Sequence, residues 1–147
     1  AITAWKFGVV IDPKLIFAPK NLGNLYHFEL IEYQNAERAF RRAIENDPLY
    51  ILSYQNLFDL YRYSYKQHTD ASTQILQEGI AHIPNAIALY ILLGEHYTSK
   101  GEDALAIETY LKALSLIKEE QNTAHIQEIE ARIAEIRMYA TKKPTTR

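Results

Sequence analysis

Large and small side chains recur along this chain at intervals of 34 to 36 residues, and this spacing limits the folds that it can adopt. The first set consists of leucines and tyrosines, namely Leu22, Leu57 and Leu93, then Tyr26, Tyr61 and Tyr97. A second set follows in the same register: Ala36, Ser72 and Ala106, then Phe40, Leu76 and Tyr110, then Ala43, Gly79 and Ala113. A period of this length is typical of a solenoid, whose units bury their apolar faces by stacking on their neighbours. The sequence therefore predicts stacked units around one continuous core.

The third unit carries the clearest motif. It reads Tyr90-x2-Leu93-Gly94-x2-Tyr97, continues through Gly101 in the turn, and ends with Ala106-x3-Tyr110-x2-Ala113. This pattern resembles the tetratricopeptide repeat, W-x2-L-G-x2-Y followed by A-x3-F and a closing proline. The first two units match less closely, with Pro19 and Tyr54 at the first aromatic position and closing prolines at Pro48 and Pro84. The resemblance implies an all-α fold, a right-handed α-solenoid of stacked helix-turn-helix repeats.

The register divides the chain into five segments of a single domain. They are the second helix of an incomplete repeat (1–15), repeat one (16–49), repeat two (50–85), repeat three (86–119) and a C-terminal capping helix (122–141). The capping helix is predicted from apolar residues at helical spacing, Ile126, Ile129, Ile133 and Ile136, opposite a charged face. The patterns predict helices at about 1–11, 17–30, 34–46, 49–64, 69–82, 85–99, 103–119 and 123–140.

Repeat two departs from the spacing of small and large residues at Phe58, which stands where Gly23 and Gly94 stand in the other units. We expect Ser72 and Gly79 on the facing helix to make room for the ring. A longer turn at residues 67–69 would accommodate the wider hairpin.

The incomplete repeat at the start of the chain leaves the apolar residues Trp5 and Val9 without a covering helix. Such a half-unit does not bury its own face. Two explanations stay open: the chain is part of a longer array, or it self-associates as a homodimer through this end.

Proteins with this repeat bind ligands in a concave groove lined by the first helix of each unit, so the resemblance implies a protein or peptide partner here. The positions that match the lining of this groove are Phe17, Lys20, Asn24, His27 and Phe28 in repeat one, Leu52, Gln55, Asp59, Arg62 and Tyr63 in repeat two, and Ala88, Ile91, Glu95, Thr98 and Ser99 in repeat three. Aromatic residues and arginine supply much of the energy at protein interfaces.

The carboxylate clamp of this family grips the terminal carboxylate of a heat-shock chaperone, and the chain retains only part of it. Lys20, Asn24 and Asn56 match the clamp, but Ala88 and Leu92 stand where it has lysine and arginine. The missing side chains would form the charge-assisted bonds to the carboxylate. An adaptor for chaperone tails is therefore disfavoured.

Other classes of function have little support in the sequence. The net charge of −2 argues against nucleic acid, and no cysteine is available for a thiolate nucleophile or a disulfide. The five histidines are scattered without metal-ligand spacing, so we expect no metal, no cofactor and no catalytic residue. The sequence contains no run of about 18 apolar residues, so we expect no membrane insertion. The cytoplasm is the default location.

The sequence thus predicts a protein–protein interaction module with a scaffold or adaptor role, and not an enzyme. Two alternatives stay open. One is an accessory helical domain of a larger enzyme or of a secretion or assembly machine. The other is an oligomeric scaffold that self-associates through the half-repeat at residues 1–15.

Overall fold

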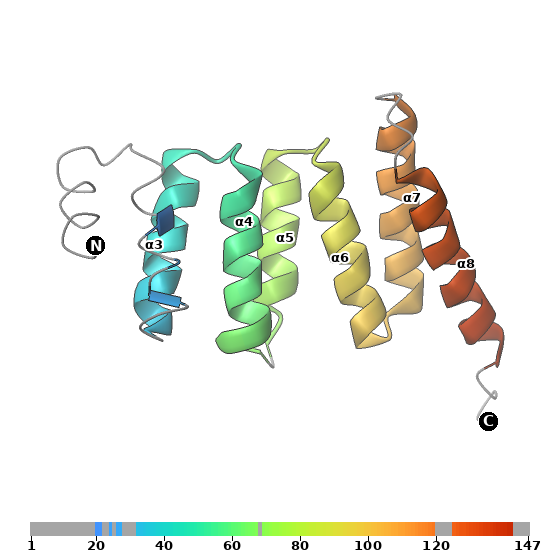
Figure 1. The fold of residues 1–147 in the computed structure, drawn as a ribbon, viewed down its shortest axis with the longest axis horizontal. Helices are drawn as coiled ribbons and strands as arrows, with labels where there is room; N and C mark the ends of the chain where they lie inside the picture. The colour runs from blue at the N-terminus through green and yellow to red at the C-terminus, as the bar shows by residue number, and fades with distance from the viewer. Residues whose placement is uncertain are drawn as a thin grey trace. The chain divides into compact units, whose positions relative to one another are not determined.

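The computed structural model describes residues 20–21, 24, 26–27, 32–67, 69–119 and 125–142. The elements within these ranges are α3 (Tyr33–Asn46), α4 (Ile51–Asp59), the π-helix η2 (Leu60–Ser64), α5 (Ala71–His82), α6 (Ile87–Lys100), α7 (Asp103–Glu119) and α8 (Ile126–Lys142) (Figure 1). The described residues contain no strand, as predicted. The ends of these helices lie within three residues of the predicted ones, except where η2 interrupts the helix predicted at 49–64. The predicted helix at 1–11 and most of that at 17–30 lie outside the described residues.

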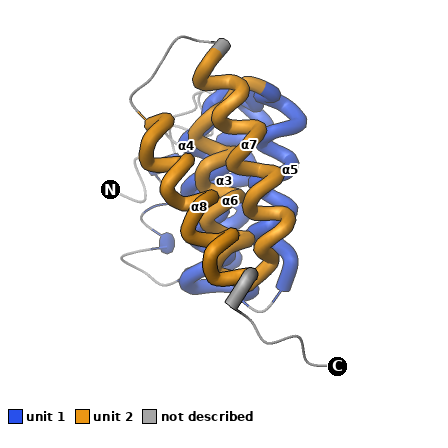
Figure 2. The backbone as a smooth tube through the Cα atoms, turned by 90° about the vertical axis from the view of Figure 1, so that its right-hand side faces the viewer, with its two compact units in different colours: residues 1–84 blue, residues 85–147 orange. Residues whose placement is uncertain are grey.

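The chain forms two compact units, residues 1–84 and residues 85–147 (Figure 2). The division follows Pro84, the residue predicted to close repeat two. The single domain expected from the sequence stays a prediction.

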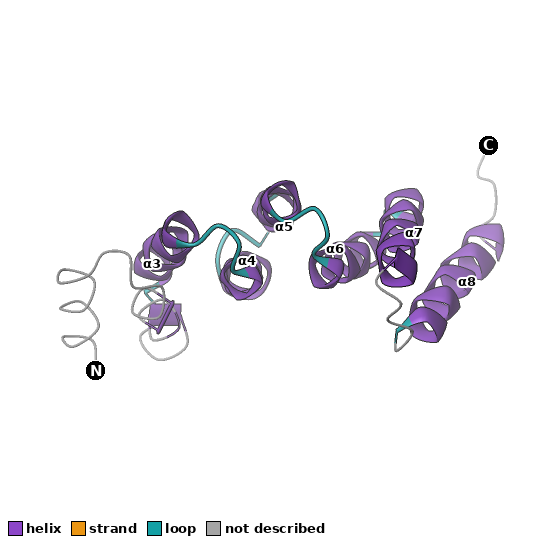
Figure 3. Ribbon diagram, turned by 90° about the horizontal axis from the view of Figure 1, so that it is seen from above, coloured by secondary structure: helices purple, strands orange, loops and turns teal. Residues whose placement is uncertain are grey.

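In the first unit, α4 packs against both α3 and α5 (Figure 3). The residues of the predicted register form its core: Ala36, Phe40 and Ala43 from α3, Leu57 and Phe58 from α4, Tyr61 from η2, and Ser72, Leu76 and Gly79 from α5 are all buried. Small side chains allow adjacent helices to approach, and the large ones fill the remaining space. The predicted alternation of small and large residues is therefore the packing pattern of this unit.

The second unit repeats this packing with α6 against α7 and α8 against α7. A Cβ atom on Gly94 would lie 2.7 Å from Cε1 of Tyr110, so the ring of Tyr110 occupies the space that a side chain would need. The helix α6 ends at Lys100 and is capped by Gly101, which has a φ of 73° and donates its N–H to the carbonyl of Thr98. This left-handed conformation is one that glycine adopts without steric cost.

In repeat two the larger residue of the equivalent pair lies on the first helix and the smaller one on the second. Phe58 is 1% exposed at the position of Gly94, and Leu76 takes the position of Tyr110. A smaller residue on the second helix thus accompanies a larger residue on the first. Ser72 and Gly79 are buried on α5, which packs against α4, as the expected accommodation of Phe58 requires.

The helix predicted at 49–64 is not a single α-helix, because its last turn is the π-helix η2. The N–H of Tyr65 donates to the carbonyl of Leu60 at 2.7 Å, and Lys66 then adopts a φ of 61°. Tyr61 and Ser72 are 11 positions apart, whereas the equivalent Tyr97 and Ala106 are nine apart. A π-helical turn holds an extra residue, so η2 absorbs part of this insertion while Tyr61 stays buried.

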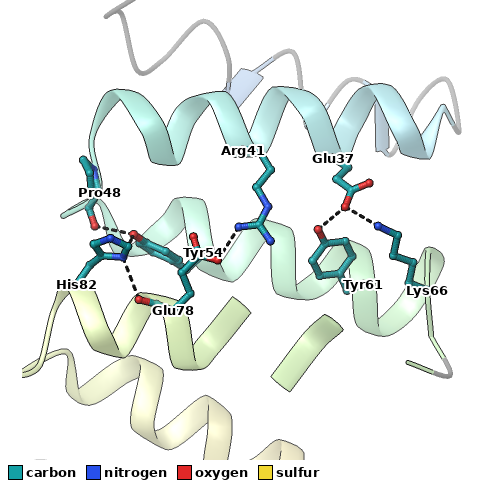
Figure 4. A network of polar contacts seen from close by, with 8 residues as sticks. All are labelled: Glu37, Arg41, Pro48, Tyr54, Tyr61, Lys66, Glu78 and His82. Atoms are coloured by element: carbon teal, nitrogen blue, oxygen red, sulfur yellow. Dashed lines mark hydrogen bonds and ion pairs between the residues drawn. The ribbon is translucent and has the colours of Figure 1, made fainter. Parts of the chain in front are cut away.

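Polar side chains tie the helices of the first unit together (Figure 4). Glu37 on α3 accepts hydrogen bonds from Tyr61 Oη and from Lys66 Nζ, the latter at 2.7 Å. Burial alone would raise the pKa of Glu37, but these hydrogen bonds and the charge of Lys66 lower it below its usual value. Arg41 Nη1 lies 2.6 Å from Glu78 Oε2 on α5. These contacts join α3 to η2, to the turn that follows η2, and to α5.

Candidate functional site

The second unit contains a pocket of about 540 Å³. The first and last helices of the unit contribute most of its lining, with Glu95, Thr98 and Ser99 from α6, and Arg132, Glu135, Ile136 and Tyr139 from α8. Gly101 after α6, and Asp103 and Tyr110 from α7, complete the lining. Glu95, Thr98 and Ser99 are the positions that the sequence assigned to the groove of repeat three.

Apolar and aromatic surface lines part of this pocket. Tyr110 and Ile136 are buried, with 1% and 6% of their surface exposed. Tyr139 is 56% exposed and therefore has surface available to a ligand. Pockets of this kind bind through apolar surface and are made selective by a few polar groups.

Carboxylates dominate the charge of the pocket. Its lining residues include three acids, Glu95, Asp103 and Glu135, against one base, Arg132. The guanidinium of Arg132 lies 2.7 Å from Glu95 Oε1 and 2.9 Å from Glu128 Oε1. The hydrogen bond to Glu128 raises the pKa of Arg132 despite partial burial of the guanidinium. The one basic group of the lining is therefore already engaged by two carboxylates.

In the first unit, five predicted groove residues lie on α4 and η2, among them Leu52, which is 43% exposed. Gln55, Asp59 and Arg62 are half-buried, while Tyr63 is 64% exposed. The guanidinium carbon of Arg62 lies 5.6 Å from the centroid of the Tyr63 ring, a cation–π distance. Burial raises the pKa of Asp59, and no charged partner among the described residues offsets that effect. Tyr63 and Arg62 thus offer an exposed aromatic surface on the same stretch of helix as the half-buried carboxylate of Asp59.

The repeat-one residues differ in their exposure. Lys20 and Asn24 are half-buried, and Lys20 Nζ lies 5.6 Å from the centroid of the Tyr50 ring. His27 is 5% exposed, and its Nε2 lies 2.7 Å from Ser64 Oγ. Burial lowers the pKa of His27. His27 therefore has little surface to offer a partner, in contrast to the groove role expected from the sequence. Phe17, Phe28, Trp5 and Val9 lie outside the described residues.

A second pocket, of about 450 Å³, lies in the first unit. Its lining comprises Glu32, Tyr33, Gln34, Asn35, Arg38 and Tyr65. Asn35 donates to Glu32 and accepts from Arg38, so the polar groups of this pocket bond to one another. Its apolar surface is small beside that of the pocket in the second unit, which we take as the stronger candidate.

The sequence pattern does not predict the α8 side of the larger pocket. The spacing of Ile129, Ile133 and Ile136 marked α8 as a helix that covers the core, and all three are buried. Continuing the same spacing to Tyr139 would have indicated an aromatic residue on that side. No sequence pattern predicts the pairing of Arg132 with Glu95, because these two residues are 37 positions apart and lie on different helices.

Two features are absent from the part of the chain that the structure describes. That part of the chain holds no group of three or more histidine, cysteine, aspartate or glutamate residues arranged to hold a metal ion. None of its helices is both long enough and apolar enough to cross a membrane.

The packed helices within each of the two units define a helical-repeat protein. Comparison with known proteins specifies the repeat: residues 88–124 match the family model of the tetratricopeptide repeat. The resemblance seen in the sequence is thus confirmed, with the match placed on the unit whose motif is clearest. A comparison with curated protein sequences gives no significant match.

Solved structures share the fold over most of the chain. A crystal structure of MamA is 21% identical, with a TM-score of 0.59, and the match covers 96% of this chain and 89% of that one. A second MamA structure is 26% identical, with a TM-score of 0.58 and coverages of 96% and 78%. The TPR2B domain of yeast Sti1, in a structure titled as its complex with pHsp70, is 20% identical, with a TM-score of 0.65 and coverages of 84% and 97%. The expected fold, an all-α tetratricopeptide-type repeat structure, is confirmed.

Proposed function

We propose that this chain is a protein-interaction module that binds a peptide or helix of a partner protein on the first helices of its repeats. The observation that carries the proposal is the pocket in the second unit, where three predicted groove positions on α6 meet α8 around apolar surface. The tetratricopeptide match of residues 88–124 supports it. So does the likeness of the fold to a Sti1 domain whose structure is titled as a complex with pHsp70.

The residues of each unit have separate roles in this proposal. In the second unit, Tyr139 and Ile136 supply apolar contact area, while the carboxylates near them select and orient the ligand. In the first unit, the exposed ring of Tyr63, with the guanidinium of Arg62 over its face, is the anchor. Aromatic and arginine side chains contribute a large share of the energy at interfaces.

The proposal is tested by identifying a partner and then measuring its binding. The chain is immobilised, proteins captured from the source organism are identified, and the shortest binding segment is titrated by calorimetry. We expect the double variant Arg62→Ala, Tyr63→Ala to weaken the affinity more than tenfold, which is about 1.4 kcal/mol.

The melting temperature of the double variant separates an effect on binding from an effect on stability. Because Tyr63 is exposed and Arg62 half-buried, the double variant should keep the melting temperature of the wild type. Unchanged affinity in the double variant, together with unchanged affinity when Tyr139 is replaced by alanine, would contradict the proposed surface. Failure to recover any partner above an empty matrix would contradict the proposed function.

A further inference from the structure

We infer that the pocket between α6 and α8 selects a partner segment that carries a lysine or arginine beside an apolar side chain. The inference rests on the proposed function and adds the chemistry of the ligand. Its basis is the combination of apolar surface from Ile136 and Tyr139 with an excess of carboxylates in one pocket.

The size of the pocket suits a side chain together with part of its neighbours. Its volume of about 540 Å³ lies within the range of pockets that bind small molecules, roughly 300–1,000 Å³. Lysine and arginine place a long apolar stem below a charged head, so one side chain uses both kinds of surface. The stem contacts Ile136 and the ring of Tyr139, and the charged head reaches the carboxylates.

The charges of the pocket favour a cation. Glu135 is exposed and Asp103 half-buried, and both line the pocket with Glu95. The exposed ring of Tyr139 adds a cation–π surface on the same side as Glu135, because the two residues are four positions apart on α8. A cationic side chain here gains charge-assisted hydrogen bonds and ring contacts together.

The contacts of Arg132 disfavour the binding of an anionic ligand group in the pocket. Its guanidinium already bonds to Glu95 and to Glu128, at 2.7 Å and 2.9 Å. A ligand carboxylate would have to displace Glu95 or Glu128 from the guanidinium. It would then lie close to both acids and be repelled by their charges. The charge arrangement is thus the reverse of the carboxylate clamp, whose lysine and arginine positions are Ala88 and Leu92 in this chain.

The equivalent position in repeat two points the same way. Asp59 precedes Glu95 by the 36-residue period and therefore holds the same place on its first helix. Among the described residues no cation pairs with the half-buried Asp59 carboxylate, and burial raises its pKa. A cationic ligand group would stabilise the ionised form of this carboxylate as well.

The test selects peptides without assuming a sequence. A random library of 12-residue peptides is passed over the immobilised chain, and the enriched peptides are synthesised and titrated by fluorescence anisotropy. We expect enrichment of lysine or arginine next to a large apolar residue, and an affinity that falls as salt is raised from about 50 to 500 mM. Enrichment of acidic peptides, or of peptides without a basic residue, would overturn the inference and leave the proposed function standing.

Three variants then locate the charge that matters. Glu135→Arg should weaken the selected peptide at least tenfold, whereas Glu130→Arg, the same change at an exposed position of α8 outside the pocket lining, should alter the affinity less than twofold. Arg132→Gln frees two carboxylates and should strengthen binding about threefold. Weaker binding by Arg132→Gln, or equal effects of the two glutamate variants, would overturn the inference. If the library yields no peptide, the inference fails, and partner capture decides the proposed function separately.

Discussion

Gly94 lies so close to the ring of Tyr110 that a Cβ atom on residue 94 would be 2.7 Å from Cε1 and 2.8 Å from Cδ1. Tyr110 is 1% exposed, so its ring has little room to move away. The contact joins the first and second helices of repeat three at the place where the family pattern has its glycine. It also gives the α6–α7 hairpin its close approach.

Gly94→Ala should therefore destabilise the chain, although alanine is the better helix former. Overpacking costs about 1–3 kcal/mol, and the gain in helix propensity returns at most about 1 kcal/mol. We expect a net loss of about 1–2 kcal/mol in chemical denaturation. The double variant Gly94→Ala, Tyr110→Leu should lose less than the sum of its single changes, because leucine is what repeat two has at that position; strict additivity would contradict the steric explanation.

Phe58→Ala should cost about 3–5 kcal/mol of unfolding free energy, because it removes a large side chain that is 1% exposed. Tyr63→Ala, five positions further along and 64% exposed, is the control and should change stability by less than about 0.5 kcal/mol. Both values come from urea denaturation followed by circular dichroism. A cost near zero for Phe58→Ala would mean that the assigned packing of repeat two is wrong.

Glu37→Gln should destabilise the first unit by about 1 kcal/mol at pH 7, because it weakens the hydrogen bonds from Tyr61 and Lys66 at a half-exposed site. The pKa of Glu37 is lowered in the folded chain, so its contribution is complete above the unfolded pKa near 4.5 and is lost as the pH falls through the lower folded pKa. Denaturation curves of the wild type and the variant should therefore converge in acid. A gap that persists at pH 2.5 would show that the contribution does not depend on the carboxylate charge.

Asp59→Asn should stabilise the chain at neutral pH. Burial raises the folded pKa of Asp59 above its usual value of 3.8, so the wild type loses stability as the pH rises through that range and stays lower above it. The advantage of the variant should thus appear at pH 7 and vanish near pH 3, as measured by thermal unfolding at the two values. If Asp59 also binds cationic ligand groups, the more stable variant should be the weaker binder, an exchange of stability for function.

Much of the fold follows from the sequence because helical hairpins place small and large residues at regular positions. Leu57, Leu93, Tyr61 and Tyr97 are all buried, as their recurrence predicted. The π-helix η2 was missed because hydrophobic periodicity does not distinguish an inserted residue in a helix from one in a turn. The longer interval between Tyr61 and Ser72 is visible in the sequence, but there it predicts only a longer turn at residues 67–69.

The candidate site was less predictable than the fold. Family resemblance indicated the α6 positions Glu95, Thr98 and Ser99 of the pocket. It gave no information on Glu135 and Tyr139, since α8 is outside the three recognisable repeats. The charge that the pocket offers a ligand depends on whether Arg132 is paired with Glu95. That pairing is known only from the distance between the two side chains, which the sequence does not contain.

The turn formed by η2 and Lys66 shows where such a unit tolerates added length. Two more residues than in repeat three are housed at one tip of the hairpin, while Tyr61 and Ser72 on either side keep their buried places. The added length thus changes the last helical turn before the tip, η2, and leaves the buried positions of Tyr61 and Ser72 in place. For protein engineers, this tip is the natural point at which to graft a reporter or a second recognition loop.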